Sequence, residues 1–170
     1  MRLFVLGLSG VLAFLAVSFF VEFSPGMEEA QAQQTVQQEE QRFLELINGY
    51  RQANGLAPLY LSETLSRASD RHSEDMGTFG FFSHTTQASN YYAAGSGHVQ
   101  RIVQEGYFSN TYSAENIAYG YHSAETVFEA WRLSPGHNVN MLSPNYRAIG
   151  IGLAYSPTGV PYWTTNFGGV

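Results

Sequence analysis

Cysteine and lysine are both absent from this 170-residue chain. Without cysteine, the protein has no disulfides and offers no thiol nucleophile, zinc ribbon or iron–sulfur ligand set. Its eight basic residues are therefore all arginine, and with fourteen acidic residues they give a net charge of −6. An acidic surface with dispersed arginines is a poor match for phosphate backbones, so we expect no nucleic-acid partner.

Charge is also missing from the beginning of the chain. Residues 3–21 are apolar apart from glycine and serine and follow a single Arg2, which is typical of an export signal. Ala30-Gln31-Ala32 supplies a small-residue cleavage pattern, but the apolar run is also long enough to cross a bilayer. We therefore interpret residues 1–32 as a signal peptide or a membrane anchor. We therefore expect a secreted or cell-envelope protein that contacts the membrane only through this N-terminal segment.

Aromatic residues are missing from the next segment, residues 28–41, which is mostly Gln and Glu. Such a segment buries too little apolar surface to offset its ordering entropy, so we interpret residues 33–41 as a tether that merges into a first helix over 36–53. Residues 42–170 then form one folded domain. Because 44% of the chain is hydrophobic and 13% charged, this domain can bury a substantial core without crosslinks.

Hydrophobic periodicity predicts three further helices in the middle of the chain. The first begins at the N-cap Ser62 and is broken by Gly77 and Gly80, and a short one covers residues 98–105. The third begins at Ser123 and is stopped by Ser134-Pro135-Gly136, so that His137 begins the next helical turn. Its apolar stripe consists of Ala124, Val127, Phe128 and Trp131.

Strict alternation predicts a strand near the C-terminus. Ile149, Ile151, Leu153 and Tyr155 alternate with small residues, so one face is bulky and the other is bare enough for close approach of a helix. A turn at 156–159 leads to a partner strand over 162–167. We expect a further short strand at 115–118. This order of elements predicts an α+β fold, a three-layer α-β-α sandwich with a small antiparallel sheet between helices.

Five short motifs support a family resemblance, and they occur in one order along the chain. They are Phe82-Ser83-His84, Gly106-Tyr107, Ala114-Glu115-Asn116-Ile117-Ala118, Trp131 with Ser134-Pro135-Gly136-His137, and Ile149-Gly150-Ile151-Gly152. Together they resemble the CAP superfamily of cysteine-rich secretory, antigen-5 and pathogenesis-related proteins, in its cysteine-free bacterial (SCP-like) branch. The resemblance extends from Phe43 to Gly168 and implies the same α-β-α sandwich.

The resemblance also implies a cleft with two histidines and two glutamates. His84, Glu115 and His137 match three members of that set, whereas Ser134 stands where the second glutamate follows the tryptophan. Glu129 precedes the tryptophan and faces away from its stripe, so we leave it out. Two imidazoles and a carboxylate suit Zn²⁺ or another divalent metal, with water completing the shell, although no cofactor is required.

A structural alternative stays open for the same residues. In it, Glu115 and His137 pair to hold the strand to the helix, and His84 is hydrogen-bonded at the rim. The nearby aromatic run of Phe79, Phe81, Phe82, Tyr91 and Tyr92 either lines an apolar groove or caps the core.

Three functions are compatible with this sequence. The first is a non-enzymatic binding module whose cleft holds a divalent metal or a small, lipid-like ligand. The lipid-like ligand is implied by the resemblance, since members of the CAP superfamily bind sterols and lipids. The second is a metal-assisted hydrolase of envelope peptides or esters, with Glu115 as base or ligand and His137 or Ser134 as further catalytic candidates. Ser134 lies in no nucleophile elbow, and no acidic third partner is identifiable. The third is an adhesion or signalling module for a protein partner, with a vestigial cleft.

Overall fold

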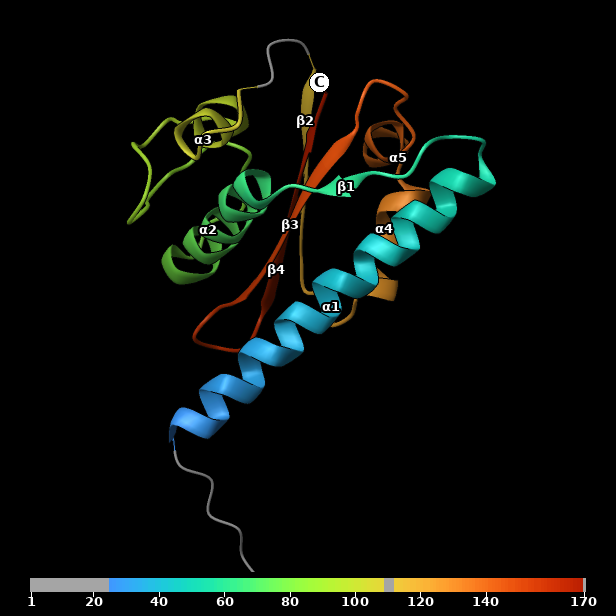
Figure 1. The fold of residues 1–170 in the computed structure, drawn as a ribbon. Coiled ribbons are helices and arrows are strands. Elements are labelled where there is room, and N and C mark those ends of the chain that lie inside the picture. The colour runs from blue at the N-terminus through green and yellow to red at the C-terminus, as the bar shows by residue number, and fades with distance from the viewer. Residues whose placement is uncertain (1–24, 109–111, 170) are drawn as a thin grey trace, which may run out of the picture.

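Four strands form one sheet in the order β1-β3-β4-β2 (Figure 1). β3 (Ala148–Tyr155) and β4 (Pro161–Gly168) form the predicted hairpin, and β2 (Ser113–Tyr119) pairs antiparallel with β4. β1 (Tyr60–Leu61) adds two residues parallel to the start of β3. The short strand expected at 115–118 is therefore confirmed and is longer than predicted.

The computed structural model describes residues 25–108 and 112–169. Most of the predicted signal peptide or anchor, residues 1–32, lies outside this range, so its cleavage and its anchoring stay predictions. Over the described ranges, no helix combines the length and apolar character needed to cross a bilayer.

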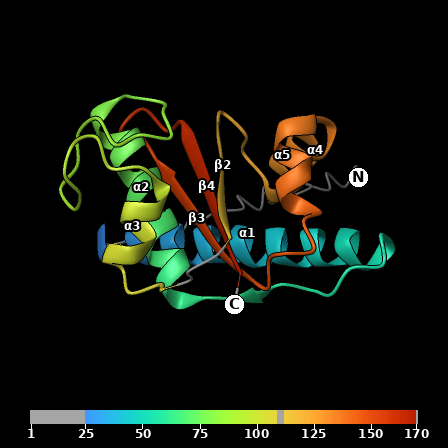
Figure 2. The same cartoon turned by 90° about the horizontal axis from the view of Figure 1, so that it is seen from above.

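Helices cover both faces of the sheet, which confirms the predicted α-β-α sandwich (Figure 2). α2 (Glu63–Phe79) and α3 (His98–Gln104) lie on one face. α4 (Ala124–Leu133) and α5 (Pro135–Met141) lie on the other, together with the C-terminal half of α1 (Pro25–Ala53). The main core fills the second layer with Phe43, Ile47, Trp131, Ile149, Leu153, Trp163 and Phe167.

The bare face of β3 explains how α2 packs. A Cβ placed on Gly150 would overlap the backbone of Leu65, and one on Gly152 would overlap the backbone of Ser69 and Asp70. The glycines therefore let the helix axis approach the strand directly. The alternation predicted from the sequence is thus confirmed on both faces of the strand.

Two helix boundaries differ from the prediction. α1 begins at Pro25, so the segment 33–41 expected as a tether is helical. Gln and Glu are good helix formers, and Glu39 and Glu40 accept hydrogen bonds from the backbone of Ala124 and Leu153, which ties this segment to the domain. α2 also continues through Gly77, because that glycine serves packing: a Cβ there would lie 3.3 Å from the backbone nitrogen of Ser156.

Candidate functional site

Glu115 lies at the centre of the predicted site. It is buried on β2, where its Oε1 accepts a hydrogen bond from His84 Nδ1 at 2.9 Å and its Oε2 accepts one from Arg101 Nη2 at 2.6 Å. Burial alone would raise the pKa of Glu115, but the His84 hydrogen bond and the Arg101 charge outweigh it and lower that pKa. The carboxylate is therefore ionised at neutral pH, and both of its oxygens are engaged.

Arg101 on α3 holds the loop that carries His84. Its Nη1 lies 3.1 Å from the carbonyl oxygen of His84, 3.1 Å from Thr86 Oγ1 and 2.9 Å from the carbonyl oxygen of Ser96. Arg101 was not predicted from the sequence, because its role depends on partners from a loop and from β2. Its position inside a seven-residue helix gives no local signal of burial.

His137 lies on α5 and is held by other residues. Its Nδ1 lies 2.8 Å from Ser134 Oγ, and its ring lies 6.1 Å from the ring of Trp131. Asn116 donates to the carbonyl oxygen of His137 at 3.2 Å and accepts from Asn140 at 2.8 Å. Burial and the charge of His84 both lower the pKa of His137, so its imidazole is neutral at pH 7.

The structure joins two of the predicted residues, His84 and Glu115, by a hydrogen bond, and His137 is near enough for the charge of His84 to act on it. Successive side chains of a strand point to opposite faces, so Glu115 reaches His84 and Arg101 while Asn116 reaches α5. In the described ranges, no hydrogen bond joins Glu115 to His137. The Glu115–His137 pair of the structural alternative is therefore wrong, since Asn116 makes the link from strand to helix. The expected rim position of His84 is confirmed, with its side chain 57% exposed.

A cleft of about 420 Å³ opens beside His137. Its lining combines aromatic rings with small residues from β2 and α4, and it consists of Phe82, Ile117, Ala118, Tyr119, Tyr121, Ala130, Trp131, Ser134 and His137. Phe82 packs against Tyr119 at 4.8 Å between ring centroids. Both interpretations of the aromatic run therefore hold in part, because Phe82 lines this cleft while Phe81 and Tyr92 are buried in the core.

A divalent metal does not fit His84, Glu115 and His137 as they are arranged. Both oxygens of Glu115 already accept hydrogen bonds. The guanidinium of Arg101, whose Nη2 lies 2.6 Å from Oε2, would repel a cation bound there. Over residues 25–108 and 112–169, no three His, Cys, Asp or Glu side chains gather to hold a metal. This arrangement opposes the metal site that the family resemblance implies, and a zinc titration tests that site directly.

Two of the candidate catalytic residues, Ser134 and His137, contact each other. Ser134 Oγ and His137 Nδ1 lie within hydrogen-bonding distance, as a nucleophile and its base do. The carboxylate that would orient such an imidazole is engaged elsewhere, since Glu115 bonds to His84 and Arg101. Glu129, which we left out, forms an exposed pair with Arg132 away from the cleft.

Comparison with known proteins agrees with this geometry. Residues 44–167 match the family model described as "CAP: Cysteine-rich secretory protein family". YkwD of Bacillus subtilis is 36% identical over 128 residues, which are 75% of this chain and 46% of YkwD. The membrane protein YlbC of the same organism is 30% identical over 128 residues, which are 75% of this chain and 34% of YlbC. The chain thus spans less than half the length of either curated relative.

Solved structures share the fold at low sequence identity. An outer surface protein of Borrelia burgdorferi superimposes with a TM-score of 0.68 at 20% identity, over 78% of this chain and 92% of that protein. An extracellular SCP-domain protein of Bacillus anthracis gives a TM-score of 0.71 at 21% identity, over 88% of this chain and 45% of that protein. Since the family model covers most of the domain and the sandwich and its cleft motifs are in place, the chain belongs to the CAP, or cysteine-rich secretory protein, family.

Proposed function

We propose that the protein is an exported, non-enzymatic binding module whose cleft beside β2 takes a small, uncharged and largely apolar ligand. The single observation that carries this proposal is the lining of the cleft, in which aromatic and aliphatic side chains predominate and Ser134 and His137 form a hydrogen-bonding pair. The cleft volume of about 420 Å³ lies in the range of small-molecule sites.

The chemistry of the lining defines the ligand class. Among the described residues, no acidic or arginine side chain lines the cleft, and the lowered pKa of His137 keeps its ring neutral at pH 7. A charged ligand would therefore meet no counter-ion from this lining, and its desolvation would be uncompensated. A lipid-like molecule with an apolar body and one hydroxyl group matches this lining, since its body can contact the aromatic rings and its hydroxyl group can hydrogen-bond to His137 or Ser134.

Export is supported by the N-terminal apolar run and by one relative of the fold. Residues 3–21 have the composition of an export signal or an anchor. The Bacillus anthracis structural neighbour is described as an extracellular protein. We propose the same side of the membrane for this domain.

A binding experiment tests the proposal directly. Dodecanol is titrated into the protein while tryptophan fluorescence is recorded, because Trp131 lines the cleft. The substitution Ala130→Leu fills the cleft and should weaken binding at least about tenfold, or 1.4 kcal/mol. Ala53→Leu, at the exposed end of α1, is the matched control and should bind like the wild type. Equal affinity in Ala130→Leu and wild type would rule out this cleft.

The other two functions stay predictions with their own tests. A metal-assisted hydrolase would turn over casein or an ester substrate and lose this activity with a chelator. A module for adhesion or signalling would bind a protein partner and leave dodecanol binding absent.

A further inference from the structure

Within the described part of the chain, the outer edge of β3 lacks a neighbouring strand over most of its length. β1 pairs only with Ala148 and Ile149, after which the chain leaves for α2. The carbonyl oxygen of Ile149 faces β1, so the alternation of the ladder also places the backbone groups of Ile151, Leu153 and Tyr155 on this outer edge. An edge that lacks a neighbouring strand can pair with an added strand, provided that the added strand displaces whatever side chains occupy it.

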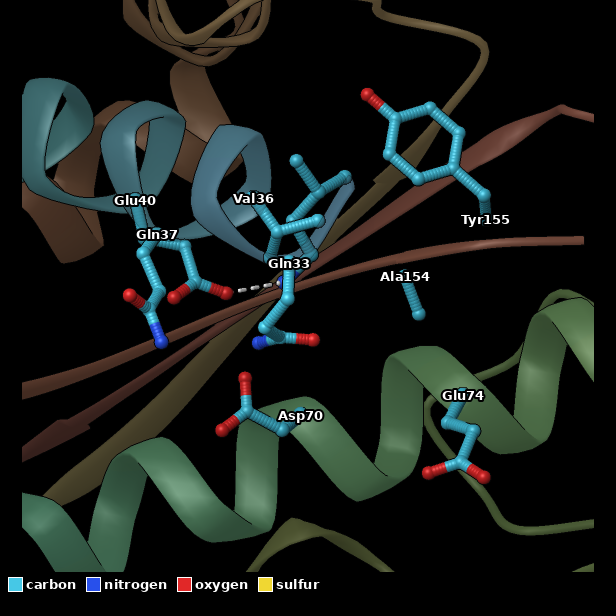
Figure 3. Close-up of a pocket in the computed structure, with 9 residues that line it drawn as sticks. Gln33, Val36, Gln37, Glu40, Asp70, Glu74, Ala154 and Tyr155 are labelled. Atoms are coloured by element: carbon cyan, nitrogen blue, oxygen red, sulfur yellow. Dashed lines mark hydrogen bonds between the residues drawn. The ribbon is translucent and has the colours of Figure 1, made fainter. Parts of the chain in front are cut away.

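Two side chains occupy the positions that a neighbouring strand would fill. Ser66 Oγ accepts the backbone N–H of Ile151 at 3.4 Å. Glu40 Oε1 accepts the backbone N–H of Leu153 at 2.8 Å, and Figure 3 shows this bond reaching from α1 toward the strand. Both contacts are of the kind that a carbonyl group of a paired strand would make.

A groove follows the same edge between α1 and α2 (Figure 3). Its larger part, about 470 Å³, is lined by Gln33, Val36, Gln37, Glu40, Asp70, Glu74, Leu153, Ala154 and Tyr155. A second hollow of about 220 Å³ shares Gln37 and Glu40 and reaches past Ile151 to Leu61 at the end of β1. The two hollows together follow the edge from β1 to Tyr155.

Among the described residues, the charged side chains that line the groove are all acidic. Glu40 projects from α1, while Asp70 and Glu74 project from α2 (Figure 3). Burial and the charge of Asp70 raise the pKa of Glu40 to about 8, and burial raises the pKa of Asp70 to about 6. The carboxyl groups are crowded, and the described lining of the two hollows includes no arginine, so a cation would be stabilised there.

We propose that this groove binds an extended peptide segment with lysine or arginine side chains, which adds a short strand to the outer edge of β3. A peptide carbonyl replaces the Glu40 carboxyl group on the N–H of Leu153, and a cationic side chain lies between Asp70 and Glu74. Gln33 and Gln37 offer amide groups to the peptide from α1. The groove lies at the opposite edge of the sheet from β2, so the inference is independent of the proposed cleft ligand.

Fluorescence anisotropy with a labelled peptide of alternating valine and lysine tests the inference. The double substitution Asp70→Asn with Glu74→Gln should weaken binding at least tenfold. Both changes keep the size of the side chain and neither residue belongs to the core, so the variant should fold. Glu63→Gln, on the same helix but outside the groove, should leave binding unchanged. A peptide N-methylated at alternate residues should bind at least tenfold more weakly, because it cannot complete a strand ladder.

Three outcomes would overturn the inference. Equal affinity of the N-methylated and parent peptides would exclude strand pairing and would show that the peptide binds through non-specific charge attraction alone. Unchanged peptide affinity in the double variant would show that the peptide binds outside the groove. A dimer of the protein alone in sedimentation, dissociated by an excess of the peptide, would assign the edge to a second copy of the chain.

Discussion

Arg101 and Glu115 form an ion pair that is closed to solvent on both sides. Nη2 and Oε2 lie 2.6 Å apart, and the two side chains are 0% and 1% exposed. The pair connects α3 to β2, and through the other bonds of Arg101 it also holds the loop that carries His84. The position of the exposed imidazole therefore depends on a charge pair buried behind it.

Breaking this pair on one side should destabilise the fold strongly. Arg101→Met leaves the Glu115 carboxylate buried without its cation, which costs about 3–5 kcal/mol of unfolding free energy. Urea denaturation measures this loss. Arg101→Met combined with Glu115→Gln should lose less than the sum of the single changes, because the second substitution removes the unpaired charge.

The matched control is Arg132→Met, which breaks an exposed pair with Glu129 on α4. Exposed pairs contribute little to stability, so this variant should unfold at the wild-type urea concentration. Comparable losses in Arg101→Met and Arg132→Met would contradict the distinct role of the buried pair.

Zinc binding should be absent or non-specific at this site. The guanidinium of Arg101 already neutralises Glu115, and a cation would have to displace it. Calorimetric titration of Zn²⁺ into the wild type and into His84→Ala with His137→Ala should give the same isotherm. A 1:1 binding event present only in the wild type would instead establish the metal site that the family resemblance implies.

Local patterns in the sequence were sufficient for most of the fold. Ser62 was identified as an N-cap because its chemistry acts within one helical turn, and it accepts a hydrogen bond from the backbone N–H of Leu65. Ser123, where a helix was expected to start, caps α4 through the backbone N–H of Thr126. Gly77 misled the prediction because a glycine that ends a helix and one that admits a neighbouring turn look the same in sequence. Only the contact with Ser156 distinguishes them.

The candidate site was predictable only in part. The family motifs implied one cleft for His84, Glu115 and His137; the structure joins His84 to Glu115, while only His137 lines the cleft beside β2. The partners of Glu115 depend on which face of β2 each side chain takes and on where α3 packs. Arg101 and the separation of Glu115 from His137 follow from tertiary contacts that no sequence spacing encodes.

Gly150→Ala should disrupt the contact between β3 and α2. A Cβ there would overlap the backbone of Leu65 and Ser66, and backbone atoms cannot rotate away as a side chain does. We expect a loss of about 3 kcal/mol or more, at the upper end of overpacking effects, measured by thermal or urea unfolding. Gly136→Ala on α5 is the control, since its Cβ would meet no atom of the described residues within 4 Å and should leave stability unchanged or raised. Similar losses in the two variants would contradict the close helix–strand packing.

His72 should make the fold sensitive to mild acid. Burial lowers its pKa to about 4, with Arg101 and His84 adding to the effect and Glu115 opposing it. Below the ordinary histidine pKa of about 6.5, His72 binds a proton in the unfolded chain but not in the folded protein. The free energy of unfolding therefore falls as the pH drops from about 6.5 toward 4.

His72→Gln keeps a donor for the carbonyl oxygen of Ser83 and removes this titration. Between pH 7 and pH 5 the wild type should therefore lose about 2 kcal/mol more than the variant. His122→Gln, exposed in the loop before α4, should follow the wild-type profile, and parallel curves for all three proteins would show that the imidazole of His72 is not held neutral by burial.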